Sequence, residues 1–342
     1  SAGSATVYYW DGAIYWNSST SLAAQPLSLA LLRQVLESII TQEYNYLLAF
    51  PISLVMRVLG TGRYVYLFSI VNLYVLPALW GLCVLARRIR WGGTLLFLAT
   101  PMLLYTGLVG FSDVAAAGAG IWALVIYTDR SRPATARGLL AGVLLTLTFL
   151  LRRYFFFFAV TFGIAALLAN LLFQRRQWKD FLALFASAAL TSLFFAQSFL
   201  IEQVLSINYG DIYSAYDQGR RVDWMMLTRY FGLVLLCAAF ALGLWLIFRR
   251  RGTGWLGTLA LLQPILCFFL FTRVQSHGQQ HLLLYLPALA LLLCAGLECL
   301  PRRLPATLCA ALLAVCTTGS SLLPRPQPAS PQEIAAPALL PS

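Results

Sequence analysis

Long apolar stretches, separated by short polar or basic breaks, dominate the chain from residue 61 onward. A helix that crosses the hydrocarbon core of a membrane needs about 20 mainly apolar residues. The pattern therefore predicts an all-α, polytopic transmembrane bundle of about ten visible spans. These spans fall at roughly 61–87, 92–110, 111–128, 137–151, 154–173, 180–200, 229–248, 254–271, 282–298 and 304–320.

Residues 1–60 precede the first predicted span and follow a different pattern. Between residues 27 and 40, apolar and polar residues segregate to opposite faces of a helix, which is typical of a helix lying in the membrane interface. The apolar face comprises Leu31, Leu32, Val35, Leu36, Ile39 and Ile40. Residues 44–59 are apolar but short for a span and contain Pro51 and Arg57. We interpret them as a second interfacial or re-entrant helix.

The rest of the chain divides into a membrane domain and a tail. The predicted membrane domain covers residues 61–322 and contains a polar loop, rich in aromatic and charged residues, at about 201–228. Residues 323–342 are rich in proline, carry little charge and show no periodicity. We expect this tail to be disordered and assign it no function.

Composition supports the membrane interpretation. Of 342 residues, 60% are hydrophobic and only 11% are charged, and the mean hydropathy is +0.76. No ordinary soluble core buries this much apolar surface. The net charge of +12 does not indicate nucleic-acid binding, because the basic residues are scattered at the ends of spans.

Arginine clusters fall at every second connection between predicted spans, as the positive-inside rule expects of cytoplasmic loops. The clusters are Arg87/Arg88/Arg90, Arg130/Arg132/Arg137, Arg175/Arg176/Lys179, Arg249/Arg250/Arg251 and Arg302/Arg303. The other connections then face outward and hold most of the carboxylates, which are Asp11, Glu37, Glu43, Asp113, Glu202, Asp211, Asp217, Asp223 and Glu333. We therefore expect the functional groups on the non-cytoplasmic side.

The same orientation places Ser1 outside, which leads us to expect a further span before it. The chain has 7 cysteines, all within or at the ends of apolar stretches. Since none lies in an outward loop, we expect no disulfide framework and no thiolate metal site.

The sequence contains no glycine-rich phosphate loop, no zinc-type spacing of Cys and His, and no nucleophile elbow. Ionisable residues at the outer rim are the candidates instead, because charges at such depths are costly and usually face a cavity. Asp11 lies in Tyr-Tyr-Trp-Asp-Gly and is either a solvated residue or a functional one. Asp113 lies in Gly-Phe-Ser-Asp between two apolar stretches and either caps the next helix or serves chemistry.

Basic residues at the same rim are the second group of candidates. Arg152 and Arg153 interrupt an apolar stretch on the outer side, where they either bind a phosphate or extend to lipid headgroups. The segment from Arg273 to His281 adds further donors, and the 2 histidines of the chain both lie in it. His277 and His281 are four residues apart, which suits a metal only if the segment is helical. We favour hydrogen bonding to substrate or within the structure.

In this order, the features resemble the GT-C superfamily of membrane glycosyltransferases, particularly the bacterial relatives of protein O-mannosyltransferases and the lipid A aminoarabinose transferase. The resemblance covers most of the chain. The similar segments are Tyr9-Trp10-Asp11-Gly12, Gln42-Glu43-Tyr44, Gly110-Phe111-Ser112-Asp113, Leu151-Arg152-Arg153-Tyr154, Gln279-Gln280-His281 and Tyr285-Leu286-Pro287-Ala288. The chain departs from the family where Tyr44-Asn45-Tyr46 replaces a Lys-Pro-Pro, and no large soluble domain follows the last predicted spans.

The resemblance implies an inverting transferase with a polyprenyl-phosphate sugar as donor and a glycan, lipid or protein of the cell envelope as acceptor. It implies a catalytic role for Asp11, as general base, and for Asp113, which would orient Asp11 or hold the acceptor. It implies a location in the cytoplasmic membrane with the site facing outward. The residues that would bind the donor and its phosphate are Glu43, Arg152, Arg153, Arg273, His277, Gln279 and His281. Glu43 would act directly or through a divalent cation, and metal dependence stays open.

Two other functions would also use many spans. A transporter or flippase of lipid-linked sugars should carry charged residues near the membrane midplane, together with broken helices or internal repeats. The predicted spans are nearly free of charge at their middles, which favours chemistry at one surface. A polysaccharide polymerase or ligase should have its large outward loop late in the chain, whereas the large outward segment here comes first.

Overall fold

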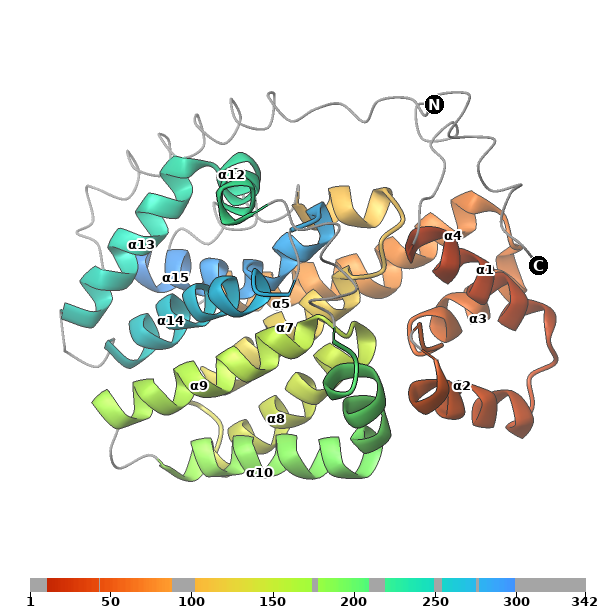
Figure 1. Cartoon of the computed structure of the whole chain (residues 1–342), viewed down its shortest axis with the longest axis horizontal. Helices are drawn as coiled ribbons and strands as arrows, with labels where there is room; N and C mark the ends of the chain where they lie inside the picture. The colour runs from red at the N-terminus through yellow and green to blue at the C-terminus, as the bar shows by residue number, and fades with distance from the viewer. Residues whose placement is uncertain are drawn as a thin grey trace.

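The computed structural model of the chain describes residues 11–42, 44–87, 102–173, 178–208, 219–248, 254–274 and 277–298. Every regular element in these ranges is a helix, which confirms the predicted all-α class. In Figure 1 the longer helices lie side by side across the molecule, and the first helices, in red and orange, gather at one side.

Short helices come first along the chain: α1 (Asp11–Ala24), α2 (Leu29–Thr41) and α3 (Ala49–Leu59). Ser28 begins α2, because its hydroxyl accepts a hydrogen bond from the backbone N–H of Leu31 at 3.2 Å. Arg57 of α3 donates hydrogen bonds to the carbonyls of Leu22 and Gln25. These carbonyls lie at the C-terminal end of α1, where a cation also complements the helix dipole. Arg57 thereby fixes α1 against α3.

The apolar face of α2 divides between the protein and its surroundings. Residues four apart in the sequence are buried, namely Leu31, Val35 and Ile39. The residues that follow each of them remain exposed, namely Leu32, Leu36 and Ile40. Part of the predicted apolar face therefore packs on the chain itself, and the rest is free to meet lipid, as an interfacial helix requires.

The remaining helices are α4 (Arg63–Ile70), η2 (Val71–Val75), α5 (Leu76–Arg87), α7 (Val114–Tyr127), α8 (Ala134–Leu151), α9 (Phe155–Phe173), α10 (Trp178–Phe195), η3 (Phe199–Leu205), α12 (Arg220–Phe231), α13 (Leu233–Phe248), α14 (Gly254–Phe271), η5 (Gln279–Leu284) and α15 (Leu286–Glu298). Among the described residues, five helices are long and apolar enough to cross a membrane. They are Arg63–Leu85, which joins α4 to α5 through the π-helical turn η2, and α8, α9, α10 and α14. The chain is therefore a multi-pass membrane protein.

Shorter helices occupy other predicted spans: α7 lies within 111–128, α13 within 229–248 and α15 within 282–298. The predicted span 304–320, most of 92–110 and the predicted tail lie outside the described residues. The count of ten spans therefore stays a prediction. The predicted polar loop at about 201–228 is partly helical, because α12 occupies its end.

Small residues allow α8 and α10 to pack closely. Gly138 and Gly142 are four residues apart on α8, and a Cβ atom built on either would lie within 2.5 Å of a backbone oxygen of α10. Close approach of this kind is a common basis of helix association in membranes. Beyond the glycines, Thr146 lies 2.9 Å from the hydroxyl of Thr191, and Ser187 donates to the carbonyl of Leu139 at 2.7 Å. Glycines and hydroxyl groups thus form one continuous interface.

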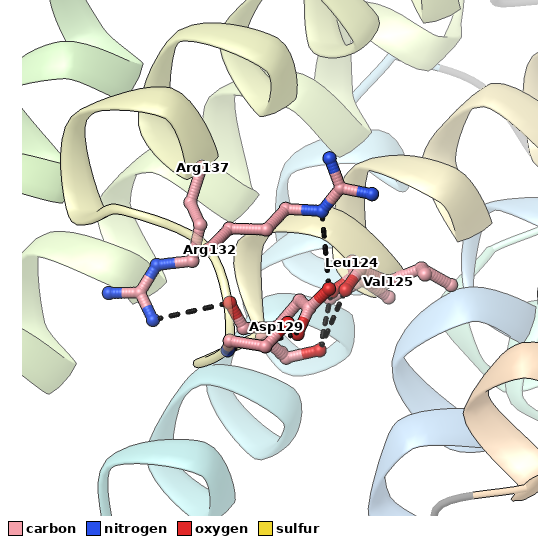
Figure 2. A network of polar contacts seen from close by, with 7 residues as sticks. Leu124, Val125, Asp129, Arg132 and Arg137 are labelled. Atoms are coloured by element: carbon pink, nitrogen blue, oxygen red, sulfur yellow. Dashed lines mark hydrogen bonds and ion pairs between the residues drawn. The ribbon is translucent and has the colours of Figure 1, made fainter.

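Asp129 and Asp180 neutralise arginines at one end of the bundle. Figure 2 shows Arg132 and Arg137 converging on the Asp129 turn between α7 and α8. Arg132 pairs with the Asp129 carboxylate at 3.2 Å, and Arg137 reaches its carbonyl at 3.5 Å. Arg137 also pairs with Asp180 of α10 at 3.3 Å, with both side chains buried. We call this group, Asp129, Arg132, Arg137 and Asp180, the basic-end cluster.

Candidate active site

A buried ion pair joins the start of α7 to the end of α8. Asp113 immediately precedes α7, and Arg152 immediately follows α8. The Nε atom of Arg152 donates to Oδ1 of Asp113 at 2.7 Å, and the two side chains are 8% and 0% exposed. The Asp113 side chain makes no capping hydrogen bond to α7. The sequence left two roles open for Asp113, capping α7 or serving chemistry. The structure excludes capping by the carboxylate.

Tyrosine rings surround the Arg152 guanidinium. The ring centroids of Tyr15, Tyr44 and Tyr154 lie 5.5, 5.8 and 5.2 Å from its Cζ atom, within the range of cation–π attraction. Arg152 also donates from Nη1 to the Tyr15 hydroxyl at 3.2 Å, while the Tyr154 hydroxyl donates to Asp113 Oδ1 at 2.5 Å. Arg152 is thus held inside the protein. It does not extend to lipid headgroups, which was the alternative to phosphate binding in the sequence analysis.

The start of α1 lies beside the turn that leads to Asp113. Asp11 is the first residue of α1, and Tyr15, which contacts Arg152, follows four residues later. The buried hydroxyl of Tyr66 lies 3.4 Å from the carbonyl of Gly12 and 3.1 Å from that of Gly110. The structure therefore brings together the two segments in which the sequence predicted catalytic carboxylates.

The segment after α2 packs on the same site. Asn45 is buried and donates from Nδ2 to the carbonyl of Leu150 at 2.6 Å, while its Oδ1 accepts the backbone N–H of Leu47 at 3.1 Å. Tyr44 lies against Tyr15, with ring centroids 5.9 Å apart, as well as over Arg152. Glu43 itself lies outside the described residues, although its neighbours are at the site.

The late polar segment reaches the site through Tyr154. The Tyr154 hydroxyl lies 3.3 Å from the carbonyl of Gln280, and the His281 ring meets the Tyr154 ring edge-on at 4.7 Å. Nδ1 of His281 accepts the backbone N–H of Gly278 at 2.9 Å, which closes the first turn of η5. His281 is therefore next to the Asp113 cluster and takes part in the local fold.

His277 is more deeply placed than the sequence suggested. Its Nδ1 lies 2.9 Å from Oδ1 of Asp223 in α12, and its Nε2 lies 2.5 Å from the hydroxyl of Tyr285. The side chains of His277 and Asp223 are 0% and 2% exposed. Both ring nitrogens of His277 thus have partners within the protein.

The other predicted site residues have simpler positions. Arg153 is partly buried in the turn between α8 and α9, and Arg273 is exposed just after α14. Gln279 begins η5. Among the described residues, no group of three or more His, Cys, Asp or Glu side chains is placed to hold a metal ion.

Sequence reasoning did not single out Tyr15, Tyr44, Tyr154, Asp223 or Tyr285 for the site. The tyrosines did not stand out, because tyrosine is enriched at the membrane–water interfaces of membrane proteins in general. Tyr154 directly follows the arginine pair and ends the similar segment Leu151-Arg152-Arg153-Tyr154, and both signals could have indicated it. Asp223 and His277 are 54 residues apart in the sequence, so their pairing depends on the fold.

Asp113, Arg152 and Tyr154 lie at one end of the helices, and the basic-end cluster lies at the other. The helical architecture defines the class of the protein, an all-α multi-pass membrane protein. Neither a protein-family model nor a curated protein sequence matches the chain.

Among solved structures, the chain is similar to ArnT from Cupriavidus metallidurans, the lipid A aminoarabinose transferase. The crystal structure of apo ArnT matches with a TM-score of 0.62 and 15% identity over 94% of this chain. The structure of ArnT bound to undecaprenyl phosphate matches with a TM-score of 0.53 and 14% identity over 89% of this chain. The chain spans 62% of the length of ArnT in both comparisons.

Proposed function

We propose that the protein is a membrane glycosyltransferase that moves a sugar from a polyprenyl-phosphate donor to an acceptor of the cell envelope. The acceptor is a hydroxyl group of a glycan, lipid or protein, and the site faces the outer side of the cytoplasmic membrane. The observation that carries the proposal is the buried Asp113–Arg152–Tyr154 cluster, placed beside the start of α1 in an ArnT-like fold. The ArnT complex with undecaprenyl phosphate supports a polyprenyl-phosphate substrate.

Asp11 is our candidate for the general base. In the proposed reaction it takes the proton of the acceptor hydroxyl, whose oxygen forms a bond to the anomeric carbon as the bond from that carbon to the phosphate oxygen breaks. The configuration of the anomeric carbon inverts. Asp113 is a poor candidate for this role, because it is fully buried and holds Arg152 and Tyr154. We assign Asp113 to positioning these two side chains.

The leaving group is a lipid phosphate, an anion that is stable without a catalytic acid. A cation near the phosphate stabilises the charge that grows on it during transfer. Arg153 lies in the same turn as Arg152 and is less buried, so it is our first candidate for this contact, with the exposed Arg273 as the second. Bidentate hydrogen bonding by guanidinium suits a phosphate group.

Transfer from labelled donors tests the proposal. The protein in lipid is incubated with polyprenyl-phosphate sugars and cell-envelope extract, and release of the sugar from its carrier is measured for wild type, Asp11→Asn and the control Asp129→Asn. We expect release by wild type and the control, and a loss of about 10²-fold or more in Asp11→Asn. The control also removes a carboxylate, but at the basic end.

Absence of release across several sugars and carrier lengths would refute the transferase and favour a transporter of lipid-linked sugars. Equal release by Asp11→Asn and wild type would retain the enzyme and remove Asp11 as its base.

A further inference from the structure

Asp223, His277 and Tyr285 form a hydrogen-bonded chain outside the proposed catalytic cluster. Oδ1 of Asp223 accepts both the backbone N–H of His277 at 2.7 Å and its Nδ1–H. Because an ionised carboxylate only accepts hydrogen bonds, it places a proton on Nδ1. In the neutral ring, Nε2 then accepts the hydroxyl of Tyr285. One carboxylate thus sets the tautomer and the orientation of the ring.

Aromatic rings enclose the chain and exclude water from it. Phe268 stacks on the His277 ring at 11° with centroids 5.7 Å apart, and Phe271 lies 4.8 Å away. Tyr285 is also buried, at 2% exposure. Hydrogen bonds gain strength in such surroundings, and an unpaired polar group becomes costly there. The arrangement of the three side chains is therefore rigid, and substrate has no access to them.

The hydrogen bond from Tyr285 to His277 spans the helical turn η5. His277 precedes η5 and Tyr285 follows it, so this bond holds the two ends of the turn together. Within the turn, the carbonyl of Gln280 lies 3.3 Å from the Tyr154 hydroxyl, which also donates to Asp113. A continuous set of contacts therefore leads from α12 through η5 to the proposed catalytic cluster.

We infer that the Asp223–His277–Tyr285 chain is a positioning device that holds η5 against Tyr154 and so fixes the hydroxyl bonded to Asp113. His277 acts on the site through η5 and does not bind the donor. The inference rests on the proposed function only where it concerns turnover, because the positioning of η5 is a property of the fold.

Hydrogen exchange of the complete chain in lipid tests the positioning directly. Tyr285→Phe removes only the hydroxyl at the end of the chain, and Asp223→Asn removes the charge at its start. Tyr127→Phe is the matched control, because it also removes a buried, hydrogen-bonded tyrosine hydroxyl, at the opposite end of α7. We expect amide exchange in residues 278–284 to rise about 10-fold or more in the first two variants and to stay unchanged in the control.

Turnover provides the second readout. We expect Tyr285→Phe to lower kcat about 10-fold with little change in KM for the lipid donor, because the donor is not a partner of this chain. Combined with Tyr154→Phe, the losses should be clearly less than additive, since Tyr154→Phe removes the hydroxyl at Asp113 that Tyr285→Phe loosens through η5. Tyr127→Phe should leave kcat unchanged.

Unchanged exchange in residues 278–284 of both Tyr285→Phe and Asp223→Asn would overturn the inference. So would an equal rise of exchange throughout the chain, because it would indicate general destabilisation. If Tyr285→Phe raised the KM for the donor and left kcat unchanged, the result would indicate that His277 and its partners bind the donor. If wild type transfers no sugar, the proposed function fails, and the exchange experiment still decides the positioning of η5.

Discussion

Arg152 carries a full charge where almost no water reaches it, and its neighbours compensate for the lost hydration. Asp113 supplies the opposite charge, the Tyr15 hydroxyl accepts a further hydrogen bond, and the tyrosine rings offer their negative faces. A guanidinium suits this place because it is planar, bonds in several directions at once and is weakly hydrated. Lysine has the same charge, but its ammonium group is not planar and cannot form these hydrogen bonds in the same geometry.

Arg152→Lys should therefore lower the free energy of unfolding by about 1.5–3 kcal/mol, the cost of losing a hydrogen bond to a charged group. Arg132→Lys is the control, because the exposed pair of Arg132 with Asp129 should contribute less than about 1 kcal/mol. Unfolding by SDS in mixed micelles measures both. Equal stability of the two variants would show that the surroundings of Arg152 do not require guanidinium.

For single residues, the sequence indicated which side chains belong to the site better than it indicated which of them are in contact. Asp113, Arg152 and His281 stood out because each is a polar residue at the end of an apolar stretch, and the structure places all three around Tyr154. The ion pair itself was not predictable. Asp113 and Arg152 are 39 residues apart, and they meet only because α7 and α8 run in opposite directions.

Among the elements, α8 and α10 show how membrane helices associate without a hydrophobic driving force. Gly142 leaves room for the backbone of α10, where a Cβ atom would lie 2.5 Å from the carbonyl oxygen of Leu184. Backbone atoms cannot turn aside as a side chain can. The spacing of Gly138 and Gly142 therefore determines where the two helices cross.

Gly142→Ala should destabilise the protein by about 1–3 kcal/mol, because the added methyl group forces the helices apart. Gly163→Ala is the matched control, since a Cβ atom at Gly163 of α9 meets no atom within 4 Å. Alanine has the higher helix propensity, so the control should be neutral or stabilising by up to about 1 kcal/mol. SDS unfolding compares the two, and a stable Gly142→Ala protein would refute the close contact.

Periodicity and length predicted the elements well where one face of a helix has one environment. The predicted ranges for α8, α9 and α14 agree with the structure to within a few residues. Prediction was less complete for α12, whose sequence mixes Arg220, Asp223 and Trp224 without a clear apolar stripe. Asp223 is buried there because His277 pairs with it, and such a partner is not visible in local sequence.

The whole molecule has two chemically different ends. One holds the Asp113 cluster, the start of α1 and η5, and the other holds the basic-end cluster. From Val114 to Tyr127, α7 contributes 14 residues, or about 21 Å of helix, between the two ends. From the Arg-rich connections, the positive-inside rule predicts that the basic end lies in the cytoplasm and that the proposed site faces outward.

Labelling of intact cells with a membrane-impermeant maleimide tests this orientation. In a background without the native cysteines, Thr61→Cys lies in the exposed connection between α3 and α4, and Ser131→Cys lies in the exposed turn of the basic end. We expect Thr61→Cys to react in intact cells and Ser131→Cys to react only after lysis. The reverse result would contradict the orientation and place the proposed site in the cytoplasm.

The contacts between α8 and α10 also bear on how the protein is made. Arg137 and Asp180 are each costly to bury alone, and they neutralise one another only after α10 has followed α8 into the bilayer. All partners of this interface lie between residues 134 and 195. The ribosome has therefore delivered both sides of this interface before it translates α12 to α15. During biogenesis, we therefore expect α8 and α10 to pair before the later helices, and with them η5, reach Tyr154.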